Sequence, residues 1–179
     1  MALIKNIKIA ISGKSGCGNT TVSRMVAETL GLSFINFTFR NLAAERGLSL
    51  EEVMRLAAED DYWDKETDRR QLLMAREPGG CVLGSRLAIW MLKEADLKVY
   101  LAAPPAVRVK RILSREGGDP EAAAAFTEYR DAQDRERYLR LYNIDNDDYA
   151  FADLVIETAG LDPAAIANLI VQAVQSGGA

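Results

Sequence analysis

The chain has 179 residues, of which 49% are apolar and 27% charged, and its formal net charge is −4. This length and composition predict one globular domain, and the acidic balance argues against nucleic acid as a partner. The sequence has no apolar run near the roughly 20 residues that span a bilayer, no signal-peptide pattern, and two cysteines, too few for a disulfide framework. We therefore expect a cytoplasmic protein that binds neither membranes nor nucleic acid, and we take it to be a monomer by default.

The basic residues and the missing histidine narrow the possible chemistry. The sequence contains no histidine, which excludes imidazole base catalysis and histidine metal sites. It has 15 arginines and 7 lysines, and the planar guanidinium group suits bidentate phosphate recognition. A coding bias explains the arginine total equally well. The positions of the arginines must therefore decide between these explanations.

A glycine-rich segment near the N-terminus separates a predicted strand from a predicted helix. Residues 7–11 are mostly apolar, with β-branched isoleucine at positions 7, 9 and 11, as in a buried strand. In residues 22–30 the apolar positions recur at helical spacing, and Gly31 stands at the expected C-cap. A glycine-rich turn between a strand and a helix can direct backbone N–H groups at an anion. We therefore expect a phosphate site here.

The spacing Gly13-x-x-x-x-Gly18-x-Thr20 is that of a P-loop, but Asn19 stands at the usual lysine position. We expect Thr20 to bind Mg²⁺ and phosphate groups to bind at Gly13, Lys14, Ser15, Gly16, Cys17, Gly18, Asn19, Thr20 and Thr21. Two groups could supply the missing lysine charge, either Lys14 in the same loop or arginines of a mobile lid. We favour the lid, because a loop-tip lysine is usually solvated.

The rest of the chain alternates predicted strands and helices. Further strands are predicted over 33–36, 81–83, 97–101 and 153–156, and helices over 41–45, 49–57, 64–74, 87–93, 104–113, 119–142 and 162–174. Ser49, Asp119 and Asp162 are the predicted N-caps. The pattern predicts an α/β fold, a doubly wound five-stranded parallel sheet. Its core would comprise 1–36, 79–114 and 146–179, and helical insertions 37–78 and 115–145 would emerge at the ligand-binding edge.

Several arginines fall near that edge. Arg40 and Arg86 each follow a predicted strand directly, which favours a role in phosphate binding. Arg108, Arg111 and Arg115 share one helix face that points into the second insertion. A further set alternates with acidic residues and could equally be a solvated helix face, namely Arg130, Arg135, Arg137 and Arg140.

The chain resembles the archaeal-type cytidylate kinases, a group of the P-loop nucleoside monophosphate kinases, over nearly its whole length. The resemblance rests on ISGKSGCGNTTV (11–22), Phe39-Arg40 with AERG (44–47), AAED (57–60), DRRQ (68–71), GSRL (84–87), EADLK (94–98), VRVKRI (107–112), RERY (135–138), LYNID (141–145) and DLVI (153–156). That group also lacks the P-loop lysine, so Asn19 agrees with it. Gly84 departs from the family pattern, in which an acidic residue often stands at this position.

The resemblance implies transfer of the γ-phosphoryl group of ATP to CMP or dCMP with Mg²⁺, giving CDP and ADP. It implies that Gly13 to Thr21 hold the ATP phosphates, that Arg40, Arg69 and Arg86 bind the monophosphate, and that residues 37–78 form the domain that binds the nucleoside monophosphate. It also implies a lid over 115–145 that brings Arg111, Arg115, Arg130 and Arg137 over the phosphates. A monophosphate is already ionised at neutral pH, so this reaction needs no histidine base.

Two other functions remain open from the sequence. A sugar-type P-loop kinase would need a carboxylate beside the acceptor hydroxyl, and the candidates are Asp60, Asp61, Asp64 and Asp68. A non-catalytic nucleotide-binding module is the second alternative, because Asn19 carries no charge. The sequence does not separate CMP from UMP, or ribose from deoxyribose.

Overall fold

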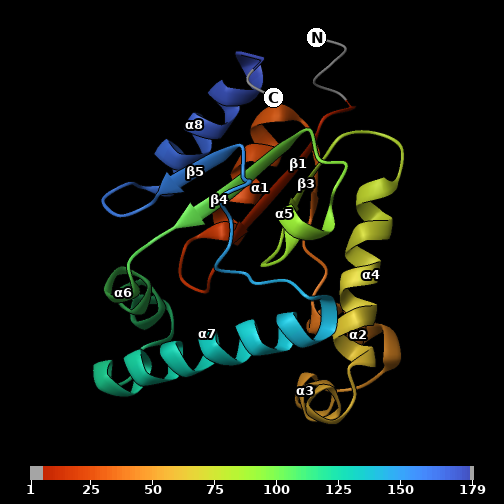
Figure 1. Ribbon diagram of the computed structural model, residues 1–179, viewed down its shortest axis with the longest axis vertical. Helices are drawn as coiled ribbons and strands as arrows, with labels where there is room; N and C mark the ends of the chain where they lie inside the picture. Colours follow the sequence, from red (N-terminus) through yellow and green to blue (C-terminus); the bar gives the residue numbers. More distant parts are fainter. Residues whose placement is uncertain (1–5, 178–179) are drawn as a thin grey trace.

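The protein folds around a five-stranded parallel sheet, which confirms the predicted fold class (Figure 1). The computed structural model describes residues 6–177, so the outermost residues of the predicted core segments lie outside the described part. The strand order is β2-β3-β1-β4-β5. The strands are β1 (Lys8–Gly13), β2 (Ser33–Ile35), β3 (Cys81–Gly84), β4 (Leu97–Ala102) and β5 (Leu154–Glu157).

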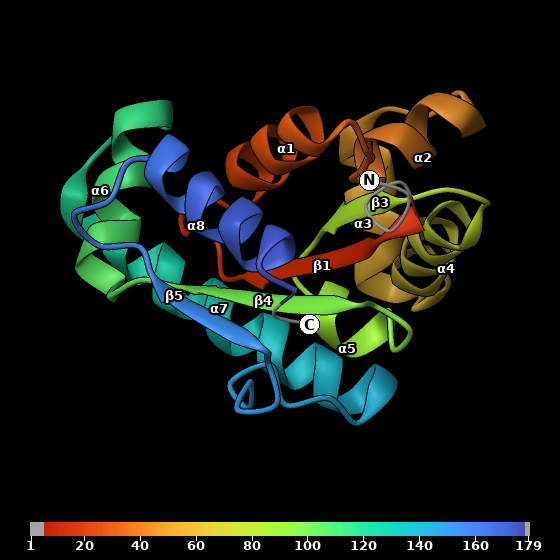
Figure 2. The same ribbon diagram turned by 90° about the horizontal axis from the view of Figure 1, so that it is seen from above.

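Helices cover both faces of the sheet (Figure 2). α1 (Asn19–Leu30) and α8 (Pro163–Gln175) pack on one face, while α5 (Ala88–Met91) and the end of α4 (Tyr62–Arg76) pack on the other. Successive residues of a strand point to opposite faces. In β1, Ile9 and Ile11 therefore join the α1–α8 core, and Ala10 joins the second core.

Side-chain caps begin three of the helices at the predicted residues. Ser49 and Glu52 form the expected capping box at the start of α3 (Leu50–Glu59). Asp119 accepts from the backbone N–H of Ala122 at the start of α7 (Pro120–Tyr142). Asp162 caps α8 in the same way, with Pro163 at the first helical position. These caps are local chemistry, which is why the sequence predicts them well.

Two helices differ from the sequence prediction. The helix expected over 87–93 is the single turn α5, which ends early because the chain turns back to join β4, and the backbone N–H of Asp96 already bonds to the carbonyl of Lys8. α1 begins at Asn19 rather than near Val22, so Asn19, Thr20 and Thr21 form its first turn.

The remaining helices gather near the carboxyl ends of the strands. α2 (Phe39–Arg46), α3 and α4 lie between β2 and β3 in the chain, and α6 (Pro105–Glu116) leads into α7. α7 runs below the strand ends, from α6 at one side to α2 and α4 at the other (Figure 1). None of the helices within residues 6–177 combines the length and the apolar character needed to cross a membrane.

Candidate active site

A cavity of about 1050 Å³ opens at the carboxyl edge of the sheet. The turn between β1 and α1 forms its floor, the segment after β3 and the inner side of α4 form its walls, and α7 crosses it. Ligand pockets in proteins commonly measure about 300–1000 Å³. This cavity therefore has room for more than one small ligand.

The glycines of the turn allow a close approach of backbone to backbone. A Cβ on Gly13 would lie 2.8 Å from the carbonyl oxygen of Leu101, and one on Gly16 would lie 2.8 Å from the carbonyl oxygen of Arg108. Gly18 is the N-cap residue of α1, and its backbone is in the left-handed conformation with φ 90°. Because glycine has no side chain, no side-chain hydrogen bond caps the helix here. The first N–H groups of α1 are therefore free to bind an anion.

Two arginines of α6 hold the back of this turn. Arg108 Nη1 donates to the carbonyl of Ser15 at 3.1 Å, and Arg108 Nη2 pairs with Asp131 of α7 at 2.5 Å. Arg111 Nη1 donates to the carbonyl of Gly16 at 3.3 Å, and its Nη2 donates to the carbonyl of Thr158 at 2.7 Å. These contacts use carbonyl oxygens and no N–H group of the turn, although the Cys17 N–H already donates to the carbonyl of Lys14 at 3.1 Å.

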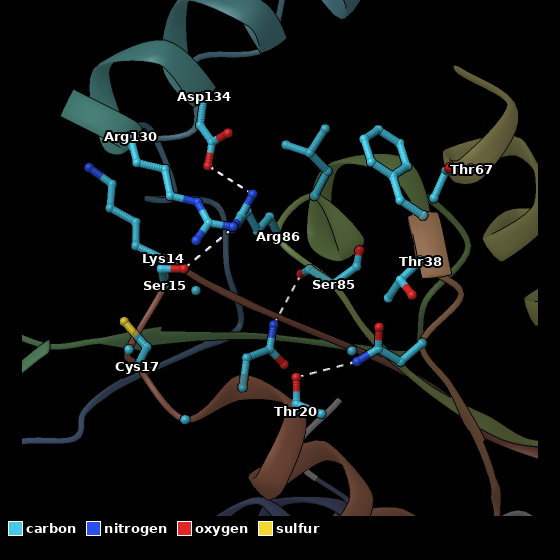
Figure 3. A pocket seen from close by; sticks show the side chains of 18 of the residues that line it. Lys14, Ser15, Cys17, Thr20, Thr38, Thr67, Ser85, Arg86, Arg130 and Asp134 are labelled. Carbon is cyan, nitrogen blue, oxygen red and sulfur yellow. Dashed lines mark hydrogen bonds and ion pairs between the residues drawn. The ribbon is translucent and has the colours of Figure 1, made fainter. Parts of the chain in front are cut away.

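Arg86 and Arg130 bring positive charge to the mouth of the turn (Figure 3). Arg86 Nη2 donates to Ser15 Oγ at 3.3 Å, and Nη1 pairs with Asp134 of α7 at 2.9 Å. Among residues 6–177 the structure shows no ion pair for Arg130. Burial, followed by the positive charge of Arg86, lowers the pKa of Arg130. Arg86 is paired with Asp134, so Arg130 next to it supplies positive charge that suits an anion.

Lys14 points to a different partner. Its Nζ pairs with Asp147 at 2.5 Å, in the loop between α7 and β5. The same loop pairs with α7, because Arg135 contacts Asp145 at 2.5 Å and Asp147 at 3.6 Å. Lys14 still lines the cavity, but its charge is neutralised in this arrangement.

The Asn19 side chain points away from the N–H groups of the turn. Its Nδ2 donates to the carbonyl of Ile11 at 3.0 Å and to the carbonyl of Ser85 at 3.2 Å. Its Oδ1 accepts from Ser23 Oγ at 2.8 Å. The carboxamide therefore binds the ends of β1 and β3.

Thr20 is suited to a hard cation. Its hydroxyl is in the first turn of α1, lines the cavity, and accepts from Asn36 Nδ2 at 3.3 Å. Residues 6–177 contain no group of three or more histidine, cysteine or acidic side chains that could hold a metal ion. Because Mg²⁺ in nucleotide sites is held mostly by phosphates and water with one or two protein ligands, this donor set fits Mg²⁺ bound together with a nucleotide.

The inner side of α4 lines the opposite wall with polar groups. Asp64, Thr67, Asp68 and Gln71 all line the cavity. Burial raises the pKa of Asp64, and it raises the pKa of Asp68 to about 6 against the opposing hydrogen bond from Tyr142. The rim near α3 and α7 is apolar, with Leu50, Met54, Phe126 and Tyr129.

α7 is joined to α4 by three polar contacts. Arg140 pairs with Asp61 at 2.6 Å, Arg137 Nε lies 3.5 Å from Asp64, and Tyr142 Oη donates to Asp68 at 2.7 Å. The acidic partners are spaced three and four residues apart, which places them on one face of α4. The C-terminal half of α7 is thereby held across the cavity.

The structure brings together many, but not all, of the residues that the sequence suggests. The cavity is lined by Gly13 to Thr21, Arg86, Arg111, Arg115, Arg130 and Arg137. Arg40 and Arg69 lie outside this lining, because Arg40 is on the exposed side of α2 and Arg69 turns outward to pair with Glu66. Arg115 pairs with its neighbour Glu116.

Sequence reasoning missed several residues of the cavity region. Helical spacing places Arg108 on one face with Arg111 and Arg115, but it does not show that Arg108 is 4% exposed and contacts the turn directly. Asp134, Thr67 and Gln71 gave no comparable signal, because their positions follow from how α4 and α7 pack.

Comparison with known proteins agrees with this geometry. The model of the cytidylate kinase-like family matches residues 8–159. "Cytidylate kinase 2" of Borreliella burgdorferi is 48% identical over 168 residues, which cover 92% of this chain and 93% of that protein. "Cytidylate kinase" of Pyrococcus horikoshii is 42% identical, over 93% of this chain and 87% of that protein.

Solved structures of lower identity share the fold. Shikimate kinase from Acinetobacter baumannii in complex with shikimate has a TM-score of 0.65 at 20% identity, covering 98% of this chain and 96% of that chain. Deoxyadenosine kinase from M. mycoides, with products dCMP and a flexible dCDP bound, has a TM-score of 0.56 at 16% identity, covering 95% of this chain and all of that chain. The extent and identity of the sequence matches show that the chain belongs to the cytidylate kinase-like family.

Proposed function

We propose that this protein transfers the γ-phosphoryl group of ATP to CMP or dCMP, giving CDP and ADP. The observation that carries the proposal is the meeting of the glycine-rich turn with Arg86 and Arg130 in one cavity. The names of the relatives, cytidylate kinase and cytidylate kinase 2, supply the acceptor.

The proposed roles follow from the position of each group. The turn from Gly13 to Thr21 binds the ATP phosphates. Arg86, which contacts Ser15 of this turn, binds the phosphate of the acceptor and also faces the γ-phosphate of ATP. Arg130 stabilises the charge on the transferred group, while Arg111 holds the turn in shape. Phosphoryl transfer passes through a loose transition state with charge spread over the equatorial oxygens, so catalysis consists mostly of positioning and charge neutralisation.

Thr20 would hold Mg²⁺ together with the ATP phosphates. Bound Mg²⁺ would neutralise charge on the β- and γ-phosphates. Position 84 adds no carboxylate to this site and has no space for one, because a Cβ on Gly84 would lie 2.6 Å from Ser23 Oγ.

The two helical insertions have different roles in this proposal. Residues 37–78, with α2, α3 and α4, form the acceptor-binding insertion, and residues 115–145, with α7, form the lid. Water would compete with CMP as phosphoryl acceptor, and a lid across the cavity would reduce this hydrolysis of ATP by excluding water. Arg40 and Arg69 would enter the site only after a movement of their helices, whereas Arg115 already lines the cavity.

A sugar-type kinase is the second candidate, because Asp64 and Asp68 line the cavity. Either carboxylate could accept the proton of an acceptor hydroxyl. However, Asp64 lies near Arg137 and Asp68 accepts a hydrogen bond from Tyr142, so both carboxylates already have partners within the protein.

A coupled ADP-release assay with Mg²⁺ and ATP tests the proposal. The acceptors are CMP, dCMP, UMP, AMP, shikimate and gluconate at equal concentration. We expect CMP or dCMP to give the highest kcat/KM. Turnover with a polyol or hydroxy acid alone would support the second candidate, and ATP binding without any turnover would support a non-catalytic nucleotide-binding module.

A further inference from the structure

The carboxamide of Asn19 has few hydrogen-bonding groups left for a ligand. Both N–H groups of Nδ2 are used, at 3.0 Å to Ile11 and 3.2 Å to Ser85, and Oδ1 accepts from Ser23. An amide nitrogen has two hydrogens to donate. A phosphate could therefore gain a hydrogen bond from Asn19 only if one of these contacts broke.

Asn19 is packed into a small cluster at the ends of two strands. The Ile11 carbonyl accepts from both Asn19 and the backbone N–H of Ser85. A Cβ on Gly84 would lie 2.6 Å from Ser23 Oγ and 3.3 Å from Asn19 Oδ1, and Ser23 is fully buried. Because Gly84 has no side chain, it leaves the space that the hydrogen-bonded Asn19 and Ser23 side chains occupy. The two departures from the common P-loop kinase pattern, at positions 19 and 84, therefore depend on each other.

The segment that Asn19 holds carries Arg86. Ser85 accepts from Asn19 through its carbonyl, and Arg86 follows directly. The Arg86 guanidinium then donates to Ser15 Oγ of the turn and pairs with Asp134 of α7. The hydrogen bond from Asn19 to Ser85, the peptide bond from Ser85 to Arg86 and the hydrogen bond from Arg86 to Ser15 therefore link the first turn of α1 to the cation at the mouth of the turn. Figure 3 shows the contact between Arg86 and Ser15.

We propose that Asn19 is a positioning residue that fixes the end of β3, so that Arg86, together with Arg130, supplies the positive charge that a P-loop lysine supplies elsewhere. The inference rests on the proposed phosphoryl transfer. Asn19 itself contacts no phosphate in this proposal. Its effect on the reaction passes through Ser85 to Arg86.

A double-mutant cycle of Asn19→Ala and Arg86→Lys tests the coupling. Arg86→Lys keeps a positive charge that can pair with Asp134 but loses the planar, bidentate guanidinium group. We expect each single variant to lower kcat by about 10- to 100-fold. The double variant should lose about as much as the more damaged single variant, since groups that act through one another are not additive. A loss equal to the product of the two single losses would overturn the proposal.

Restoring the common lysine gives a second test. In Asn19→Lys the two hydrogen bonds to Ile11 and Ser85 are lost, so we expect kcat to fall by about 10-fold or more. A rise in kcat would overturn the proposal, because it would show that position 19 faces the phosphates and merely lacks charge.

Stability and binding measurements separate positioning from a purely structural role. Asn168→Ala is the control, because Asn168 is exposed on α8, and it should match the wild type in both kcat and unfolding midpoint. If Asn19→Ala lowers the midpoint but leaves the kcat of the folded enzyme unchanged, Asn19 is structural and the proposal fails.

The proposed function can fail separately. In that case the wild type phosphorylates none of the acceptors. Calorimetric titration of the wild type, the two single variants and the double variant with MgATP then tests the coupling of Asn19 to Arg86. Non-additive losses of ATP affinity support the coupling of Asn19 to Arg86, and additive losses overturn it.

Discussion

Arg86 and Arg40 both follow strands at the ligand edge, yet their surroundings differ. Arg86 contacts Ser15 and Asp134 inside the cavity, whereas Arg40 is exposed on α2. The helical register of α2 turns Arg40 outward, and the sequence cannot reveal that register relative to the cavity.

We expect Arg86→Ala to lower kcat/KM for the acceptor by about 100-fold or more, the scale of losing one preorganised charge stabiliser. Arg40→Ala should change it by no more than a few-fold. Initial-rate kinetics with CMP varied at saturating ATP measure both variants. Comparable losses would mean that α2 turns Arg40 into the cavity when the acceptor binds.

Asp68 is expected to make stability depend on pH. Burial raises its pKa from 3.8 to about 6. Between these values the folded protein keeps a proton on Asp68 that the unfolded chain releases, so this group makes the folded state less stable as pH rises from about 4 to about 6. Asp68→Asn keeps an acceptor for Tyr142 and removes the titration.

We therefore expect Asp68→Asn to match the wild type near pH 4 and to exceed it by about 3 kcal/mol in free energy of unfolding at pH 7. Urea titrations at half-unit steps of pH measure the difference. A constant offset between the two proteins across the whole range would contradict the assignment of the pKa shift to Asp68.

At the scale of helices, two equivalent caps lie in different tertiary environments. Asp119 and Asp162 each accept one backbone N–H at 2.8 Å, and each is followed by proline. α8 buries Ile166, Ala167, Ile170 and Val171 against the sheet, whereas α7 buries Thr127, Asp134 and Tyr138. The same local bond therefore serves a core helix in one case and a helix bridging the cavity in the other.

We expect Asp162→Ala to lower the global free energy of unfolding by about 1 kcal/mol, the usual cost of losing a cap. Asp119→Ala should change it by a few tenths, while amide exchange at residues 120–123 becomes faster. Denaturant titration and hydrogen exchange together measure both effects. Equal global losses would indicate that α7 unfolds together with the core.

At the scale of the whole molecule, stability and function are separated in space. The α1–α8 side of the sheet holds a large apolar core that includes Ile9, Ile11, Leu97, Leu101 and Ile170. The cavity lies at the carboxyl edge and carries the charged side chains. Polar contacts join α7 to α4 across it, and such contacts can exchange for ligand contacts more easily than a packed core can rearrange.

Adjacent residues of α8 test this separation. Ile170 is fully buried, and Leu169 is 44% exposed. We expect Ile170→Ala to cost about 2–5 kcal/mol of stability, because it leaves a cavity, and Leu169→Ala to cost about 0.5 kcal/mol or less. The kcat of the folded protein should be unchanged in both. Urea unfolding and initial rates measure the two quantities, and a matching loss of kcat in Ile170→Ala would show that the core and the cavity are coupled.

The sequence by itself determined the order of the elements, the parallel sheet, the glycine-rich turn and the caps. Each depends on residues close together in the chain: periodicity for the strands and helices, spacing for Gly13 to Thr20, and single side chains for the caps at Ser49, Asp119 and Asp162. Local patterns carry this information because the hydrogen bonds concerned join near neighbours.

The tertiary structure decided which charged groups meet. Asn19 bonds to Ser85, 66 residues away, and Lys14 pairs with Asp147 rather than facing the cavity with a free charge. Of the candidate arginines, Arg86 and Arg130 line the cavity, while Arg69 turns to Glu66. Helical spacing tells which residues share a face, but which face meets the cavity depends on the packing of α2, α4 and α7 against the rest of the chain, and no local pattern contains that packing.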